Sequence, residues 1–327
     1  MLASKATKRR SDSLAEVMEL DIVLRAVFAP ALAVCVAALL LHVVSRAIPA
    51  RIPNNSFRAR TVRYLTPLRW MPLLLVLSPV VAHLHLQPGF AWPCTTSYAW
   101  LPVALVIGAV IALITGTVTN RFIRVMVAVV AATCTIAVLT PPTIGGVGYQ
   151  LVAALIAAMA ALGTGVAARP TAHPRVAPFI ALWIVAACAS VLCVLSGFAK
   201  LGIVVGALSA GSAALAVASA MAPSVRLGYG GAVTIACTMA ACMFIGAGYD
   251  ESGFPLAAWA AVAISPAFMA VGELPVFATR PRTRWCVTIA APAVVALCAV
   301  VTALWVSGLL SKPTKQSAPE EIYTSAW

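Results

Sequence analysis

The chain consists of long apolar runs separated by short polar connections, and it contains no internal repeat. Runs of about 20 residues with few charges recur along its length, and each is long enough to cross about 30 Å of hydrocarbon. A backbone in lipid must satisfy its own hydrogen bonds, so these runs are predicted to be helices; barrel strands would alternate in polarity and be half as long. The pattern therefore predicts an all-α, polytopic transmembrane helical bundle with no soluble domain.

We expect ten membrane spans, with nine or eleven as the alternatives. The least marked division separates the sixth span from the seventh, because only a turn around Gly197 and Lys200 lies between them. The ten spans are 22–44, 71–87, 99–118, 123–140, 149–168, 178–198, 201–222, 230–247, 255–277 and 286–310.

Polar segments flank this single transmembrane domain, which extends over residues 22–310. The N-terminal tail, 1–21, has basic residues before an apolar run, as a signal peptide does. The run is far longer than a signal peptide requires and lacks a convincing cleavage site, so we expect the first span to be retained. The C-terminal tail, 311–327, is polar and contains proline, which predicts disorder.

The composition excludes a soluble globular domain. Hydrophobic residues make up 62% of the chain, charged residues make up 9%, and the mean hydropathy is +1.00. In soluble domains about 25% of residues are charged. The net charge of +13 does not indicate a nucleic-acid partner, because the arginines lie in short loops between apolar runs. Arginines in such loops set the orientation of the chain and contact anionic lipid.

Cysteine and histidine give little support for a metal, a cofactor or a disulfide framework. Nearly all of the nine cysteines lie within apolar spans, where they act as small hydrophobic residues, and no CxxC motif occurs. His83 and His85 are two residues apart and would point about 200° away from each other on a helix, so they cannot chelate one ion. Hydrogen bonding at the membrane interface is the favoured interpretation of this pair.

Motifs of membrane enzymes are incomplete. There is no HExxH and no Walker A loop. The sequence GAGYD, residues 246–250, places its aspartate one position too late for the GxGD of intramembrane aspartyl proteases. Ser209 lacks the G-x-S-x-G spacing of a serine protease, and no histidine follows it.

Two Ser-Pro pairs near span midpoints are the first candidates for a transport site. Proline at such a position frees a backbone carbonyl one turn earlier, and serine adds a hydroxyl beside it. Transporters use such groups to hold a solute or ion at mid-membrane depth, although proline kinks are also frequent in membrane helices generally. The candidate residues are Ser78, Pro79, Ser265 and Pro266, and we expect the two pairs to border one cavity.

Glu273 is the only acidic residue inside a hydrophobic stretch between residues 22 and 319. It lies at the C-terminal end of a predicted helix, where the helix dipole disfavours a carboxylate. An ion pair would keep it charged; the alternative is a neutral carboxyl that exchanges protons in transport. The candidate partners are Arg121, Arg124, Arg280, Arg282 and Arg284.

The longest connection, residues 45–70, is basic. Apolar residues at helical spacing cluster on one side of it and arginines flank them, which fits a helix lying in the headgroup layer. A loop that only sets orientation fits equally well. The arginines expected to contact lipid headgroups are Arg58, Arg60, Arg63 and Arg69.

The distribution of basic residues predicts the topology. The odd-numbered connections contain 14 arginines, whereas the even-numbered ones contain a single base, Lys200. Positive residues in short loops stay in the cytoplasm, so the odd connections face inward and both termini face outward. The bases near Met1 oppose an external N-terminus, and a start at Met18 would remove them. The fourteen arginines are Arg46, Arg51, Arg58, Arg60, Arg63, Arg69, Arg121, Arg124, Arg169, Arg175, Arg226, Arg280, Arg282 and Arg284.

Together these features predict an integral protein of the bacterial cytoplasmic membrane that transports a small solute. A non-catalytic scaffold or anchoring subunit of a complex is the second interpretation, because buried polar groups are scarce. A membrane-embedded enzyme is the third.

Overall fold

The computed structural model describes residues 24–50, 67–87, 94, 96–115, 118, 120–139, 146–168, 175–278 and 280–308. All regular elements in this part of the chain are helices and none is a strand, which confirms the predicted all-α class. The elements are η1 Leu24–Phe28, α2 Ala29–Ala50, α4 Pro67–Leu86, α5 Ser97–Thr115, α6 Arg121–Leu139, α7 Gly146–Ala167, α8 Ala177–Leu195, α9 Ala199–Met221, α10 Gly228–Gly248, α11 Leu256–Ile264, η2 Ser265–Glu273, α12 Pro275–Ala278 and α13 Pro281–Val306.

Each of the ten predicted spans coincides with a helix or with consecutive helices. Among the described residues, nine helical segments are long and apolar enough to cross a membrane, and two of them combine consecutive elements, η1 with α2 and α11 with η2. Only α6 has a shorter apolar stretch, Val125–Ile136. The chain is therefore a multi-pass membrane protein by the length and composition of its helices.

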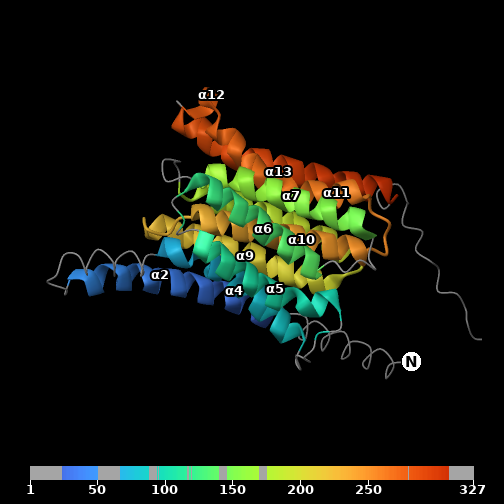
Figure 1. Ribbon diagram of the computed structural model, residues 1–327, viewed down its shortest axis with the longest axis horizontal. Coiled ribbons are helices and arrows are strands. Elements are labelled where there is room, and N and C mark those ends of the chain that lie inside the picture. Colours follow the sequence, from blue (N-terminus) through green and yellow to red (C-terminus); the bar gives the residue numbers. More distant parts are fainter. Residues whose placement is uncertain are drawn as a thin grey trace, which may run out of the picture.

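The helices lie side by side in one bundle (Figure 1). Helices α13, α7 and α11 lie along one side of the view, α2, α4 and α5 along the other, and α6 and α10 between them. Helix α12 marks one end of the bundle, and α13 runs from there toward the opposite end. Helix α10 packs against α4, α5, α6, α7 and α11, so it is the central helix.

Small residues allow α10 to be enclosed on every side. All 17 residues from Gly230 to Gly246 are buried. A Cβ atom on Gly230 would lie 2.6 Å from the carbonyl oxygen of Ala112 on α5, and one on Gly246 would lie 2.5 Å from the Trp259 ring on α11. Such distances are tolerated only where glycine stands, and they let neighbouring helices approach closely.

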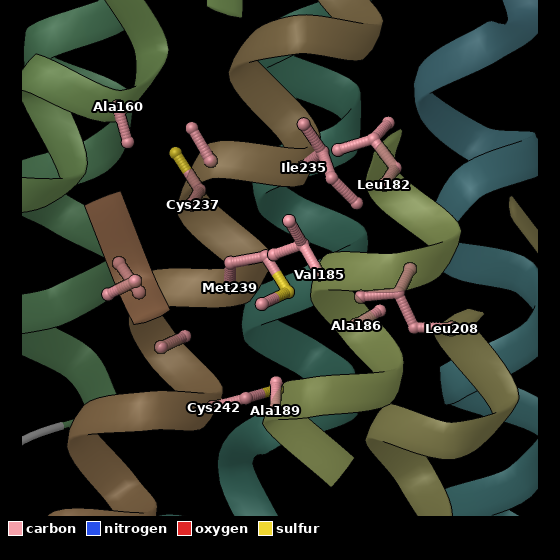
Figure 2. Close-up of a cluster of buried hydrophobic side chains, with 14 of the residues drawn as sticks. Ala160, Leu182, Val185, Ala186, Ala189, Leu208, Ile235, Cys237, Met239 and Cys242 are labelled. Carbon is pink, nitrogen blue, oxygen red and sulfur yellow. The ribbon is translucent and has the colours of Figure 1, made fainter. Parts of the chain in front are cut away.

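The apolar core around α10 is built from small and medium-sized aliphatic and sulfur-containing side chains (Figure 2). Ile235, Met239 and Cys242 of α10 lie next to residues of α8 such as Val185 and Ala189. These side chains carry no polar group other than thiols and thioethers, so the middle of the bundle is held by close packing.

Peripheral helices expose apolar side chains on one face. In η1 and α2 the outward residues recur about once per helical turn, while Val34 and Ala38 on the other face are buried. In a membrane protein such a continuous apolar outer face is covered by lipid. The outward residues are Leu24, Phe28, Leu32, Val36, Leu40 and Val43.

The ninth span changes from an α-helix to a 3-10 helix at Ser265, directly before Pro266. Its 18 residues would reach about 27 Å as a continuous α-helix. With nine residues in each form, they reach about 31 Å, which matches the hydrocarbon thickness. Pro266, Met269 and Gly272 are buried at intervals of three residues, which is the repeat of a 3-10 helix.

Candidate functional site

Ser78 and Pro79 lie in α4, and both are buried. The Ser78 hydroxyl donates a hydrogen bond of 2.6 Å to the carbonyl of Ala207 on α9. A Cβ atom on Gly211, also on α9, would lie 3.0 Å from the Ser78 side chain. Ser78 therefore joins two closely packed helices.

Ser265 and Pro266 lie where α11 meets η2, and both are buried. The Ser265 hydroxyl donates a hydrogen bond of 2.8 Å to the carbonyl of Val262. The Ser265 hydroxyl thus donates to the Val262 carbonyl, which was expected to be left without a hydrogen bond by Pro266.

The structure does not bring the two Ser-Pro pairs together. Helix α4 packs against α2, α5, α9 and α10, whereas η2 packs against α7, α8, α11 and α13. Figure 1 shows α10 between α4 and α11. The predicted cavity shared by the two pairs fails for this reason: a helix that is buried on every side separates them.

Glu273 ends η2 and contacts Arg284 in the first turn of α13. The guanidinium donates two hydrogen bonds to the carboxylate, one of them 3.1 Å long from Nε to Oε1. Arg280 and Arg282 are exposed. Of the arginines predicted as partners, Arg284 is thus the one that pairs with Glu273, while the side chains of Arg121 and Arg124 lie outside the described residues.

Glycine brings the two helices of this ion pair together. A Cβ atom on Gly272 would collide with the Thr288 hydroxyl and would lie 3.2 Å from the Arg284 carbonyl. Thr288 in turn donates to that carbonyl at 2.8 Å. The last turn of η2 therefore rests directly on α13, which positions Glu273 over the guanidinium.

Of the arginines predicted to contact lipid headgroups, only Arg69 is described. It lies in the first turn of α4 and is partly exposed. Arg58, Arg60 and Arg63 lie outside the described residues.

A different group of polar side chains lies at the end of the bundle farther from Glu273. His83 is 1% exposed, and neither ring nitrogen has a hydrogen-bond partner among the described residues. Gln87, the residue directly after α4, has its side chain near the imidazole, but the two do not form a hydrogen bond of standard geometry. The hydroxyls of Ser97 and Tyr98, in the first turn of α5, are likewise buried and unpartnered within the described part of the chain. We refer to His83 and Tyr98, whose rings are in contact, together with Ser97, the neighbour of Tyr98 in α5, as the polar cluster.

Aromatic rings connect the polar cluster to the surface. The ring centroids of His83 and Tyr98 lie 4.4 Å apart. Tyr98 is followed by Phe198 at 5.2 Å, and Phe198 by Tyr249 at 5.2 Å. Tyr249 is 39% exposed, so the row of rings runs from the protein surface to a buried imidazole.

Four segments from three different connections meet at this site. They are the end of α4, the start of α5, the turn between α8 and α9, and the connection between α10 and α11. Gly197 permits the tight turn before Phe198, because its φ of +90° is open to glycine and strained for other residues. The backbone N–H of Glu251 donates to the Ser196 carbonyl at 3.3 Å and ties the last of these segments to that turn.

Two carboxylates follow Tyr249 at the exposed end of the row of rings, which we call the mouth of the site, and they have different surroundings. Asp250 accepts hydrogen bonds from the backbone N–H groups of Ser252 and Phe254, at 2.9 and 2.7 Å. The indole N–H of Trp259 lies 3.4 Å from the same carboxylate. Asp250 therefore fixes the loop before α11, whereas Glu251 is exposed.

Sequence reasoning named His83 but missed the residues that lie next to it. The two histidines of α4 do face different ways, since His83 is buried and His85 is exposed. The assignment of the pair to interfacial hydrogen bonding does not fit His83, whose nitrogens are buried without a partner in the described chain. Ser97 and Tyr98 could not be identified from sequence. They are the first residues of an apolar helix, and which helix packs against it depends on tertiary structure.

No protein-family model matches the chain, and no curated protein matches it in sequence.

Proposed function

We propose that this protein is a permease for a small polar solute, which binds at the polar cluster. The observation that carries the proposal is His83, a buried imidazole whose two nitrogens have no partner among the described residues. A buried polar group without a hydrogen bond costs about 1–3 kcal/mol, so a group retained in that state calls for an explanation. A bound solute would provide the missing partners.

The cluster has the composition of a solute site. Its imidazole and hydroxyl groups both donate and accept hydrogen bonds, and aromatic rings adjoin them. Small-molecule sites in proteins combine a few convergent polar groups with apolar and aromatic walls. Residues from four segments contribute, so the separation of those segments would open the site.

The proposed topology places the site on the outer face of the membrane. The four segments belong to the second, sixth and eighth connections, which contain the single base Lys200. The arginines are in the odd connections, which the positive-inside rule assigns to the cytoplasm. The site would then receive its solute from outside the cell.

Cysteine labelling in intact cells tests this orientation. We expect a membrane-impermeant maleimide to label Lys200→Cys beyond the level of the parent protein, and to label Ser56→Cys no more than the parent until the cells are opened. The reverse pattern would refute the topology and place the site on the cytoplasmic face.

A solute panel tests the permease itself. Thermal unfolding of the purified chain in nanodiscs is measured with amines, amino acids, sugars and carboxylic acids. We expect at least one class to raise the Tm of the wild type, and to raise that of Tyr98→Phe less, because a ligand stabilises the state that binds it. Equal shifts in both proteins, or none in either, would refute the site.

A scaffold remains the second candidate, and the enclosed helix α10 favours it. A bundle whose central helix touches its neighbours through glycine is suited to a rigid anchoring role. A scaffold gains nothing from unpartnered polar groups, so it predicts no solute-dependent shift in the panel.

A further inference from the structure

We infer that the solute is a small organic cation, with an ammonium group at one end and an uncharged hydrogen-bonding group at the other. This inference rests on the proposed function, because it concerns the same site. It follows from the order of chemical groups between the surface and His83.

The outermost group is the carboxylate of Glu251. Its side chain is exposed, and no base lies within ion-pair distance of it among the described residues. Its Oε2 lies 3.4 Å from the position of a Cβ atom on Gly197, so it stands over the turn that leads to Phe198. Asp250, in contrast, is engaged by backbone N–H groups. Glu251 is therefore the negative charge at the mouth that is open to a ligand.

Aromatic rings come next. Tyr249 and Phe198 lie directly inside the mouth, with Tyr98 beyond them. The face of an aromatic ring attracts a cation within about 6 Å of its centroid, and quaternary ammonium ligands are bound in this way. A carboxylate followed by aromatic rings favours a cation and disfavours an anion.

The innermost groups include no acidic side chain, lysine or arginine among the described residues. The polar cluster contains an imidazole and two hydroxyls, and none of the described Asp, Glu, Lys or Arg side chains belongs to it. A charge buried there would lack a counter-charge, which is costly, whereas a hydroxyl or amide would find both donors and acceptors. The solute is thus expected to turn its charge toward Glu251 and its uncharged polar end toward Tyr98 and His83.

Choline and three analogues test this assignment on the full chain in nanodiscs. Choline has a trimethylammonium group and a hydroxyl. Its uncharged isostere carries a tert-butyl group in place of the trimethylammonium, tetramethylammonium lacks the hydroxyl, and the isosteric carboxylate reverses the charge. We expect choline to raise the Tm more than each of the other three probes does.

Two variants separate the two ends of the site. Glu251→Gln should weaken choline binding about tenfold, as expected for the loss of one charge contact, and should leave the isostere unaffected. Tyr98→Phe should weaken choline and the isostere alike, because both use their hydroxyl there. Arg282→Gln, an exposed charge change at the other end of the bundle, is the matched control and should change neither.

The outcomes distinguish this inference from the proposed function. If the isostere or the carboxylate binds as well as choline, and does so less well in Tyr98→Phe, the site stands and the cation assignment is wrong. If Tyr98→Phe changes the response to no probe, both the assignment and the site are wrong.

Discussion

The two ends of the bundle differ in whether certain buried polar side chains have hydrogen-bond partners. At the end that carries α12, the Glu273 carboxylate receives two hydrogen bonds from Arg284, and His42 is hydrogen-bonded to Ser224. At the other end, His83 and the Tyr98 hydroxyl have no partner among the described residues. The charged pair and the His42–Ser224 pair thus complete hydrogen bonds at one end, whereas His83 and the Tyr98 hydroxyl at the other end do not within the described chain.

This difference separates structural polar groups from a candidate binding site. A charge at a helix end in a membrane attracts attention first, yet Glu273 is accounted for by its ion pair with Arg284. The uncharged cluster is less conspicuous in the sequence, and its hydrogen-bonding capacity is unused. Unused capacity, rather than charge, indicates where a solute would bind.

Breaking the ion pair should have the largest effect. Arg284→Met keeps an unbranched, largely apolar side chain but removes the guanidinium and leaves the Glu273 carboxylate unpaired, which should lower the free energy of unfolding by about 3 kcal/mol. The side chains are 12% and 17% exposed, which places the cost toward the low end of the range for buried pairs. The double variant Glu273→Leu with Arg284→Met removes both charges and should cost much less. Equal losses in the single and double variants, measured by chemical unfolding, would contradict the structural role of the pair.

Separating the helices that carry the pair should have a smaller effect. Gly272→Ala introduces a methyl group where Thr288 and the Arg284 backbone lie, and should cost about 1–3 kcal/mol through overpacking. Gly148→Ala in α7 is the matched control, because a Cβ atom there meets nothing within 4 Å. It should stabilise the protein by up to about 1 kcal/mol through helix propensity. Similar thermal shifts in the two variants would contradict the close contact between η2 and α13.

Removing a hydroxyl should have the smallest effect, with opposite signs at two tyrosines. The Tyr98 hydroxyl is buried without a partner in the described residues, so Tyr98→Phe should stabilise the solute-free protein by about 1 kcal/mol. The Tyr149 hydroxyl donates to the Phe244 carbonyl at 2.7 Å, so Tyr149→Phe should destabilise it by about 1 kcal/mol. The Tm values of both variants, measured without solute and compared with that of the wild type, test the two opposite changes in stability. A loss of stability in Tyr98→Phe would show that its hydroxyl already has a partner.

The helices could be predicted from sequence because lipid imposes a simple rule on the backbone. Each apolar run had to become a helix, so the positions of the spans followed from length and polarity alone. The 3-10 form of Ser265–Glu273 did not follow, because it depends on contacts of Gly272 with α13 and on the distance the span must cover. Pro266 indicated a break there but not the kind of helix that follows it.

The site was harder to predict than the fold. The partner of Glu273 could be narrowed to a few arginines, since Arg284 is only 11 residues away along the chain. The contact of His83 with Tyr98, and of Tyr98 with Phe198, depends on how the ends of α4, α5 and α8 converge. The two Ser-Pro pairs resemble each other in sequence, yet α10 separates them, and a pattern along the chain does not reveal which helix lies between two others.

The central claim is that the unpartnered hydrogen-bonding groups of the polar cluster bind a solute. The most direct test measures the Tm of the wild type and of a Ser97→Ala, Tyr98→Phe double variant in nanodiscs, without solute and with the most stabilising member of the panel. We predict that the double variant is more stable than the wild type without solute and gains less from it, since its hydroxyls no longer bind. A double variant that is less stable without solute, or that gains as much from it as the wild type, would contradict the claim.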